Sequence, residues 1–231
     1  MNSLIAAALA FVGLHFLLSH PLRAPLVKAL GARGFLGLYS GVALVTFFWM
    51  VRAFGRVEPQ PLWWVAGDLV WLAASAAMLV GAVLFVGSLF GNPAFPNPTA
   101  REPMVPAPGG VFAITRHPMM WGFALWALVH LAVSPTDANA VLTGAILILA
   151  LVGAWLQDRK KQRLQPASWP EWQARTSYFP FAAQISGRAP WTLGGGRALI
   201  GGAAVWIVAT KLHIVLGGAM EAGIWRWVSI G

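Results

Sequence analysis

The sequence predicts an all-α fold, a polytopic bundle of about six transmembrane helices that forms a single domain over residues 1–231. Hydrophobic residues make up 58% of the chain and charged residues only 10%, whereas a soluble domain carries roughly 25% charged residues. Six apolar segments approach the roughly 20 residues that a helix needs to cross the hydrocarbon core of a bilayer. They are residues 4–18, 35–54, 66–90, 118–133, 140–156 and 198–216.

The flanking residues suggest where these segments end. The first and fourth are short, so we expect them to borrow residues from their flanks. The third carries Asp68, which we place near the outer end because a charge at the bilayer centre is costly. Pro118 can begin the fourth segment, since proline at the first helical position loses no hydrogen bond. The fifth stops before the basic run at 159–163, and three glycines at 194–196 form a turn before the sixth.

The basic residues predict the topology. Twelve of the sixteen Lys and Arg residues lie in the connections that follow the first, third and fifth segments. The positive-inside rule places these connections in the cytoplasm. Both termini then face outward, in a multi-pass protein of the cell inner (plasma) membrane. Because this topology explains the net charge of +9, we predict the lipid bilayer as the partner of the chain and no nucleic acid.

Two cytoplasmic connections are long, at about 91–117 and 157–197. The first is rich in proline and cannot form a long helix. The second contains Trp169, Trp172 and Tyr178, and these residue types favour the headgroup level of a membrane. We expect the second connection to be an interfacial linker, and a dedicated site for a lipid headgroup is the alternative.

The five histidines are the main candidates for chemistry, because ionisable groups within a bilayer are costly and tend to be functional. At about 1.5 Å of helix rise per residue, His15 lies about 16 Å and His130 about 12 Å below the outer boundary. Two histidines at one depth can bind haem iron axially from two helices. His213 falls at a similar level and is the reserve ligand, whereas His20 and His117 fall at the cytoplasmic edge. For each histidine taken alone, a packed and hydrogen-bonded structural role remains the other interpretation.

Other chemistries fit the residues less well. The chain has no cysteine, which excludes iron–sulfur clusters, thiolate-ligated haem and cysteine nucleophiles. The carboxylates are scattered without the paired spacing of a hydrolase, and the sequence contains neither GxSxG nor HExxH.

Three motifs carry a resemblance to a known family. The segment ITRHPMMWG at 114–122, followed by LWALVHL at 125–131, resembles the NnrU family of bacterial membrane proteins. GLHF at 13–16, SHPLR at 19–23 and the stretch from Trp172 to Phe181 look like the same family, so the resemblance covers nearly the whole chain. It implies an NnrU-like integral membrane domain with a role in denitrification and nitric oxide metabolism.

The NnrU family is similar to plant 15-cis-zeta-carotene isomerase, a membrane enzyme with haem b held by two histidines. That resemblance implies His15 and His130 as the two iron ligands. It does not extend to a cysteine near the second ligand of the isomerase, because this chain has none. A cysteine-dependent redox switch therefore cannot carry over.

The RHP block and the later aromatic stretch also resemble membrane methyltransferases of the isoprenylcysteine carboxyl methyltransferase type, which use S-adenosylmethionine. Under that resemblance Arg116 and His117 would contact the cofactor, opposite Asp158 and Arg159. The paired glutamates of those enzymes are absent here. Under the haem interpretation Arg116 and His117 are cofactor-binding candidates at the inner edge, with His117 placed to bond a propionate, a loop carbonyl or His20.

The sequence thus predicts a membrane protein that binds haem b and acts in nitric oxide or redox physiology, as sensor, carrier or accessory factor. The alternative is a haem-dependent cis–trans isomerase that acts on a membrane polyene. If the chain is an enzyme, we expect this activity. A methyltransferase dependent on S-adenosylmethionine is the third. Apart from haem, an apolar small molecule or nitric oxide is the expected ligand.

Overall fold

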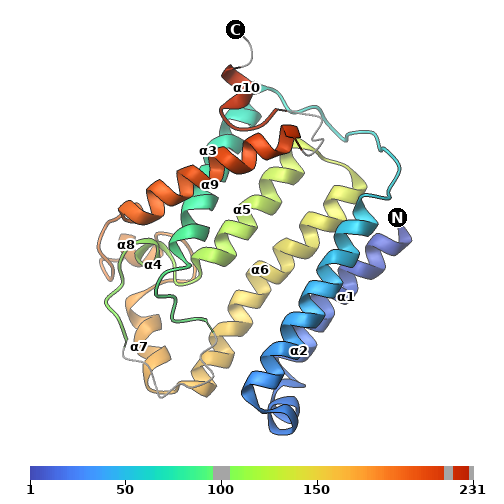
Figure 1. The fold of residues 1–231 in the computed structure, drawn as a ribbon. Helices are drawn as coiled ribbons and strands as arrows, with labels where there is room; N and C mark the ends of the chain where they lie inside the picture. Colours follow the sequence, from blue (N-terminus) through green and yellow to red (C-terminus); the bar gives the residue numbers. More distant parts are fainter. Residues whose placement is uncertain (96–104, 216–220, 229–231) are drawn as a thin grey trace.

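The computed structural model describes residues 1–95, 105–215 and 221–228, and within these ranges all regular structure is helical. The prediction of an all-α fold is confirmed. The helices are α1 (Asn2–Ser19), α2 (Arg23–Phe54), α3 (Asp68–Gly87), α4 (Val111–Ile114), α5 (Pro118–Val133), α6 (Asp137–Leu164), α7 (Ser168–Arg175), α8 (Ala182–Ile185), α9 (Gly196–Val215) and α10 (Trp225–Val228). The longer ones form the bundle in Figure 1.

Five of these helices, α1, α2, α3, α6 and α9, are long and apolar enough to cross a membrane. The remaining predicted span, the fourth segment at 118–133, is α5, which has 16 residues, about 24 Å at the usual rise per residue. It is as apolar as its neighbours but shorter than the roughly 30 Å hydrocarbon core. The bundle is therefore that of a multi-pass membrane protein with one short central helix.

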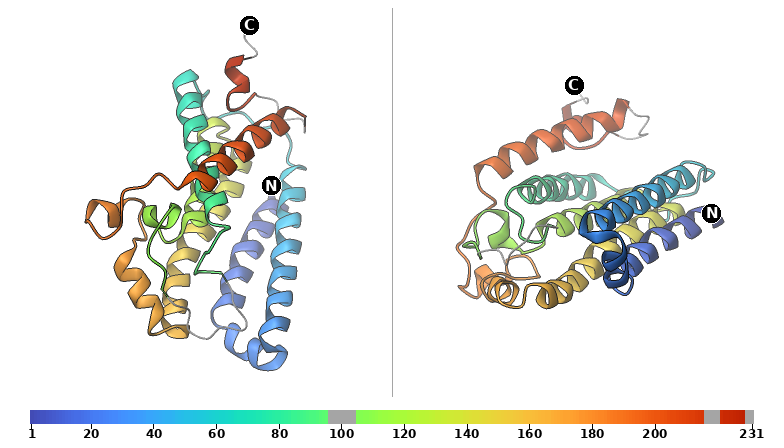
Figure 2. Two further views of the ribbon diagram at one scale, coloured as in Figure 1. Left: turned by 60° about the vertical axis from the view of Figure 1, so that its left-hand side comes forward. Right: turned by 60° about the horizontal axis from the view of Figure 1, so that its bottom comes forward.

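The long helices pack as a series of neighbours. α9 packs on α3, α3 on α5, α5 on α6, α6 on α1 and α1 on α2, and Figure 2 shows the same arrangement from two further sides. Leu4 of α1, Met50 of α2 and Leu142 of α6 belong to one buried cluster. This cluster joins the α1–α2 hairpin to α6.

Glycines permit the closest helix contacts. A Cβ atom on Gly122 of α5 would lie 2.9 Å from the carbonyl oxygen of Gly81 in α3. A Cβ atom on Gly202 of α9 would lie 2.6 Å from the Cα atom of Val83 in α3. Small residues at helix crossings are typical of membrane bundles, since they let backbones approach. α3 is therefore tightly packed between α5 and α9.

Some helix limits differ from the predicted ones. α2 begins at Arg23, with a break at Gly31, whose φ of 71° is in the left-handed region. α6 continues through the basic residues to Leu164, so the second long connection is shorter than expected and itself contains α7 and α8. Long Lys and Arg side chains at a helix end can reach the interface while the helix continues. Residues 96–104 of the first long connection lie outside the described residues.

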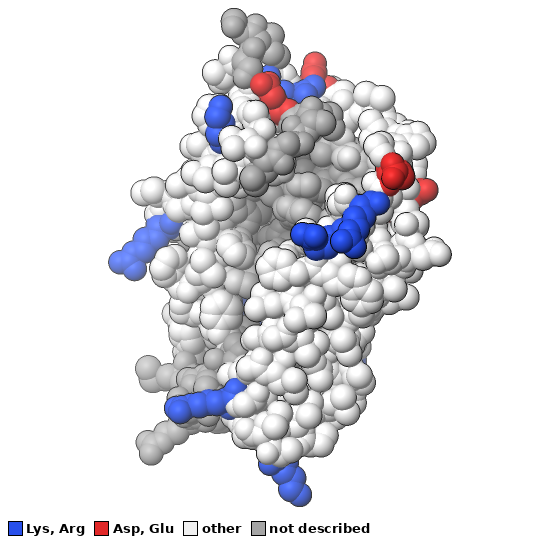
Figure 3. Space-filling model, turned by 45° about the vertical axis from the view of Figure 1, so that its right-hand side comes forward, with Lys and Arg blue, Asp and Glu red and all other residues white. Residues whose placement is uncertain are grey.

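The surface of the bundle suits a lipid environment. Large apolar side chains are widely exposed, among them Val45 at 69%, Leu69 at 83% and Ile200 at 76%. Most of the face in Figure 3 carries no charge, and its acidic side chains gather at one end. The protein itself does not cover these apolar side chains, and contact with lipid chains would explain their exposure.

The orientation stays a prediction that the cysteine-free chain makes easy to test. Glu58 in the α2–α3 connection and Leu164 at the end of α6 are both exposed. In intact cells, Glu58→Cys is expected to react with an impermeant thiol reagent and Leu164→Cys to react only after permeabilisation. The reverse pattern would place the termini in the cytoplasm.

Candidate functional site

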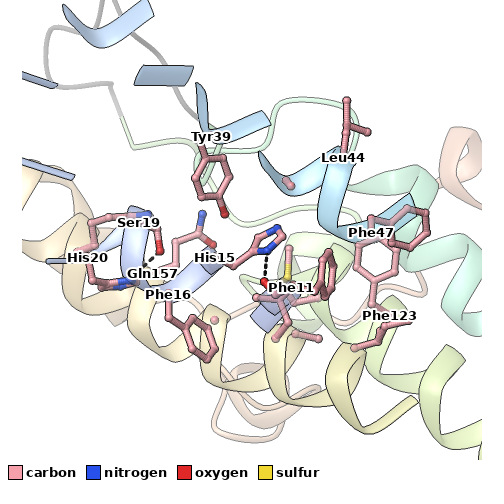
Figure 4. Close-up of a pocket in the computed structure, with 17 residues that line it drawn as sticks. Phe11, His15, Phe16, Ser19, His20, Tyr39, Leu44, Phe47, Phe123 and Gln157 are labelled. Carbon is pink, nitrogen blue, oxygen red and sulfur yellow. Dashed lines mark hydrogen bonds between the residues drawn. The ribbon is translucent and has the colours of Figure 1, made fainter. Parts of the chain in front are cut away.

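A cavity of about 480 Å³ lies among α1, α2, α5 and α6. This is within the range of roughly 300–1,000 Å³ usual for small-molecule sites. Its walls are mostly apolar, as Figure 4 shows. The lining residues are Phe11, His15, Phe16, Ser19, His20, Tyr39, Ala43, Leu44, Phe47, Met120, Phe123, Ile146, Leu149, Ala150, Gly153, Gln157 and Lys160.

His15 lies in the middle of this cavity. Its Nδ1 donates to the carbonyl oxygen of Phe11, one turn earlier in α1, at 2.6 Å. Its ring meets the rings of Phe11 and Tyr39 edge-on, with centroids 4.5 and 5.5 Å apart. A carbonyl oxygen only accepts, so Nδ1 carries the proton and the neutral ring keeps its lone pair on Nε2. Histidines that bind metals are typically oriented by this kind of bond.

One end of the cavity is polar, and we name it the inner end after the predicted orientation. His20 caps the end of α1, with its Nδ1 2.8 Å from the Ser19 hydroxyl and its Nε2 3.3 Å from the carbonyl oxygen of Leu156. Gln157 and Lys160 line the same end. Among the described residues, no carboxylate lies within ion-pair distance of Lys160. In Figure 4 Phe11, Phe47 and Phe123 lie toward the opposite end, and only Phe16 lies beside His20, so the cavity is amphipathic along its length.

These features match a haem. Its flat apolar ring suits the aromatic walls, its propionates suit a cationic end, and its iron takes an imidazole with a free nitrogen. Within the described ranges no three His, Asp or Glu side chains converge as a metal site. Axial ligation of a haem needs only one or two side chains, so the residues present fit this cofactor.

His130 lies outside this cavity. Its ring stacks on Trp126, with centroids 4.1 Å apart, and lies 6.0 Å from the ring of His213 in α9. Nδ1 of His130 donates to the carbonyl oxygen of Trp126, and Nδ1 of His213 to that of Ala209, both at 2.8 Å. The predicted ligand and the reserve ligand are therefore neighbours, and neither lines the cavity with His15.

The structure differs from the equal depth expected for His15 and His130. Asn139 Nδ2 donates to the carbonyl oxygen of His130 at 2.7 Å. The α6 residues of the cavity begin at Ile146, about 10 Å further along the helix. Two axial nitrogens on one iron are only roughly 4 Å apart. In this structure His130 would have to move inward to share an iron with His15, and ligation by both stays a prediction.

The length of α5 explains why His15 and His130 lie at different depths. The expected depth assumed that a full 30 Å of hydrocarbon separates Pro118 from the outer boundary. α5 ends at Val133, and the last turn lies beside Asn139 at the start of α6. Leu4 of α1 packs at the same end, in one cluster with Ala138. His130 is therefore near the outer end of the bundle, while His15 is four residues from the inner end of α1.

Arg116 and His117 form a separate buried cluster at the inner end of α5. Arg116 donates from Nε and Nη2 to Oδ2 of Asp158, at 2.8 and 2.6 Å. Nε2 of His117 is 2.8 Å from Oδ1 of the same carboxylate, and its side chain is 1% exposed. The backbone N–H of Arg116 donates to the carbonyl oxygen of Ser177 at 2.8 Å. One carboxylate thus joins the start of α5 to α6.

Hydrogen bonds around this cluster connect it to the second long connection. Thr115 Oγ1 and Trp121 Nε1 donate to the carbonyl oxygen of Tyr178, at 2.7 and 2.9 Å. The Tyr178 hydroxyl donates to the carbonyl oxygen of Leu151 at 2.6 Å. Burial, together with the negative charge of Asp158, raises the pKa of the Tyr178 phenol. The phenol remains a neutral hydrogen-bond donor, and the cluster is a structural junction between α5, α6 and the second long connection.

Sequence reasoning missed some members of both sites. Tyr39 and Lys160 of the cavity were not predicted, although each is a polar residue within or beside an apolar segment. Asp158 was considered only under the methyltransferase resemblance. A lone carboxylate at the inner end of a helix, opposite the RHP block, was a signal for an ion pair. The order of residues along the chain does not show which side chains on different helices face one another.

Comparisons of the sequence with known proteins point to one family. Residues 3–220 match the family described as NnrU protein. The chain is 29% identical over 174 residues to the chloroplastic 15-cis-zeta-carotene isomerase of Arabidopsis thaliana and 27% identical over 176 residues to that of Zea mays. Each match covers 70% of this chain and 44% of the isomerase, so the chain spans less than half the length of these relatives. No solved structure matches significantly. Because the family match extends over nearly its whole length, the chain belongs to the NnrU family.

Proposed function

We propose that this membrane protein binds haem b in the cavity among α1, α2, α5 and α6, with His15 as an axial ligand. The observation that carries the proposal is an oriented imidazole with a free Nε2 in an apolar cavity. Lys160 and His20 at the inner end are the expected partners of the propionates. Iron binds neutral imidazole, and the apolar walls favour that form.

The second axial ligand has two candidates. His130 is the ligand implied by the resemblance to the carotene isomerase, and it would reach the iron only if the outer half of α5 moved inward. Met120 lines the same cavity as His15, and a Met thioether opposite a His is a known axial pair. Bis-histidine and histidine–methionine haems have different visible and near-infrared spectra, which distinguishes the two.

The chemistry supported best is that of a haem protein acting on an apolar molecule or nitric oxide in the membrane. Two relatives are named as isomerases of a carotene, and the apolar cavity favours haem-dependent cis–trans isomerisation as the activity if the chain is an enzyme. A role in nitric oxide and redox physiology, including denitrification, is the other haem-based function. A bound haem would supply the iron chemistry, and the chain would orient the ligand and exclude water.

A methyltransferase is favoured less by the described geometry. Arg116 and His117, its predicted cofactor contacts, both bond Asp158. An S-adenosylmethionine carboxylate or ribose would have to displace these buried bonds.

The test is an absorption spectrum of the protein purified from cells supplied with a haem precursor. A Soret band with low-spin visible bands, and one haem per chain by pyridine haemochrome, is the expected result. A folded preparation that remains colourless after haem addition would refute the proposal. Product analysis with a cis-polyene then separates isomerase from sensor or carrier.

A further inference from the structure

The cavity is walled by helix packing on three sides. α1 packs on α2 and on α6, and α5 packs on α6. Within the described residues α2 and α5 share no comparable interface, because α5 packs instead on α3. Four helices thus surround the cavity, and the side between α2 and α5 is the one that packing leaves open.

The side chains on this fourth side reach the surface. Leu44 and Phe47 of α2 and Phe123 of α5 line the cavity, yet they are 57%, 38% and 38% exposed. Figure 4 shows the three at the same end of the cavity. A side chain that borders a cavity and is also exposed marks its mouth, so the mouth lies between α2 and α5.

The mouth lies at the middle of the membrane. Leu44 is ten residues before the end of α2 at Phe54, and Phe123 is ten residues before the end of α5 at Val133. Ten residues correspond to about 15 Å of helix, which is half the thickness of the hydrocarbon core. The side chains at the mouth are apolar, and at this depth they face lipid chains and not water.

From this geometry we infer that the cavity takes up a long apolar chain molecule directly from the bilayer, through the mouth between α2 and α5. The molecule would enter past Leu44 and Phe123 and lie in the cavity that His15 lines. The inference deepens the proposed function, and it rests on that function only for the cofactor beside which the molecule would lie. A water-soluble substrate would find no polar partner along this route.

Photolabelling in proteoliposomes tests the route. The probe is a long alkyl chain that carries a mid-chain diazirine, dissolved in the bilayer around the purified haem-loaded protein. After illumination, mass spectrometry is expected to find label on the inner wall of the cavity, at Ala150 and Gly153, as well as on the lipid-facing surface. Because Ala150 is only 2% exposed, label there requires entry into the cavity.

Matched variants make the test specific to the mouth. Leu44→Trp is expected to lower labelling of the inner wall several-fold, because the larger ring narrows the mouth. Val45→Trp, on the next residue of the same helix, is 69% exposed and does not line the cavity, so it should leave labelling unchanged. Phe47→Ala should widen the mouth and raise the labelling. Surface labelling serves as the internal standard for each variant.

Label on the surface but not on Ala150 or Gly153 in the wild type would overturn the inference. Equal inner-wall labelling in Leu44→Trp, Val45→Trp and Phe47→Ala would also overturn it. The haem spectrum of the same preparations reports separately on the proposed function. A protein with a normal Soret band and no inner-wall label refutes the route alone, whereas a labelled protein without haem refutes the cofactor alone.

Discussion

The His15→Ala variant is expected to lose the low-spin spectrum of the proposed haem, either by becoming five-coordinate or by failing to retain haem. The reason is that His15 is the histidine that Phe11 O orients within the apolar part of the cavity. The other histidine that lines the cavity, His20, lies at its polar end and is bonded to Ser19 and Leu156, so it does not replace His15. The measurement is the visible spectrum and haem content of purified protein, with folding checked by circular dichroism.

Three further substitutions locate the second ligand and control for folding. His213→Ala removes a similarly hydrogen-bonded imidazole that is exposed and lies outside the cavity, so the spectrum should be unchanged. Exactly one of His130→Ala and Met120→Leu should convert the iron to a five-coordinate state, and that result identifies the sixth ligand. An unchanged six-coordinate spectrum in His15→Ala would show that the haem is bound elsewhere.

The Asp158→Ala variant is expected to be less stable than the wild type by about 3–5 kcal/mol, the usual effect of removing one partner of a buried ion pair. Arg116 and Asp158 are only 12% and 7% exposed at their side chains. Without the carboxylate, a buried guanidinium and the His117 ring lose their partner together. Denaturant or thermal unfolding in detergent measures this loss.

Two controls separate this effect from general damage. Glu171→Ala breaks the exposed i,i+4 pair with Arg175, whose side chains are 45% and 49% exposed, and should change stability by at most about 1 kcal/mol. Arg116→Met combined with Asp158→Leu removes both charges and should be more stable than Asp158→Ala alone. Equal losses for the exposed and buried pairs would show that the cluster is not a structural junction.

Much of the fold could be predicted from the sequence, because the demands of a bilayer are visible in composition. The fourth predicted segment, 118–133, has the same limits as α5, since Pro118 begins a helix and the apolar run ends at Val133. His20 and His117, predicted to lie at one edge of the membrane, flank the end of α1 and the start of α5, and the cytoplasmic side of that edge stays a prediction. The end of α6 was predicted too early because basic residues at an interface do not stop a helix.

The candidate site was less predictable, since it depends on how helices face one another. Depth estimates rested on the rise per residue, but α5 ends three residues after His130, which places His130 about 4.5 Å from the helix end and not at the expected depth of about 12 Å. The ring of His130 meets His213 from a helix that follows it by about eighty residues. In a membrane helix, apolar residues cover both the packed and the lipid-facing sides, so hydropathy does not show which residues face a cavity.

From the amino-acid sequence alone one can derive the class of molecule, a membrane bundle of apolar helices, and its family, while iron binding by its histidines stays a prediction. The tertiary structure establishes which of these groups meet. It placed His15 beside Tyr39 in the cavity, joined Arg116 to Asp158 and left the side between α2 and α5 open. The physical reason is that composition sets the solvent of a helix, whereas rotation, tilt and length relative to its neighbours set its contacts.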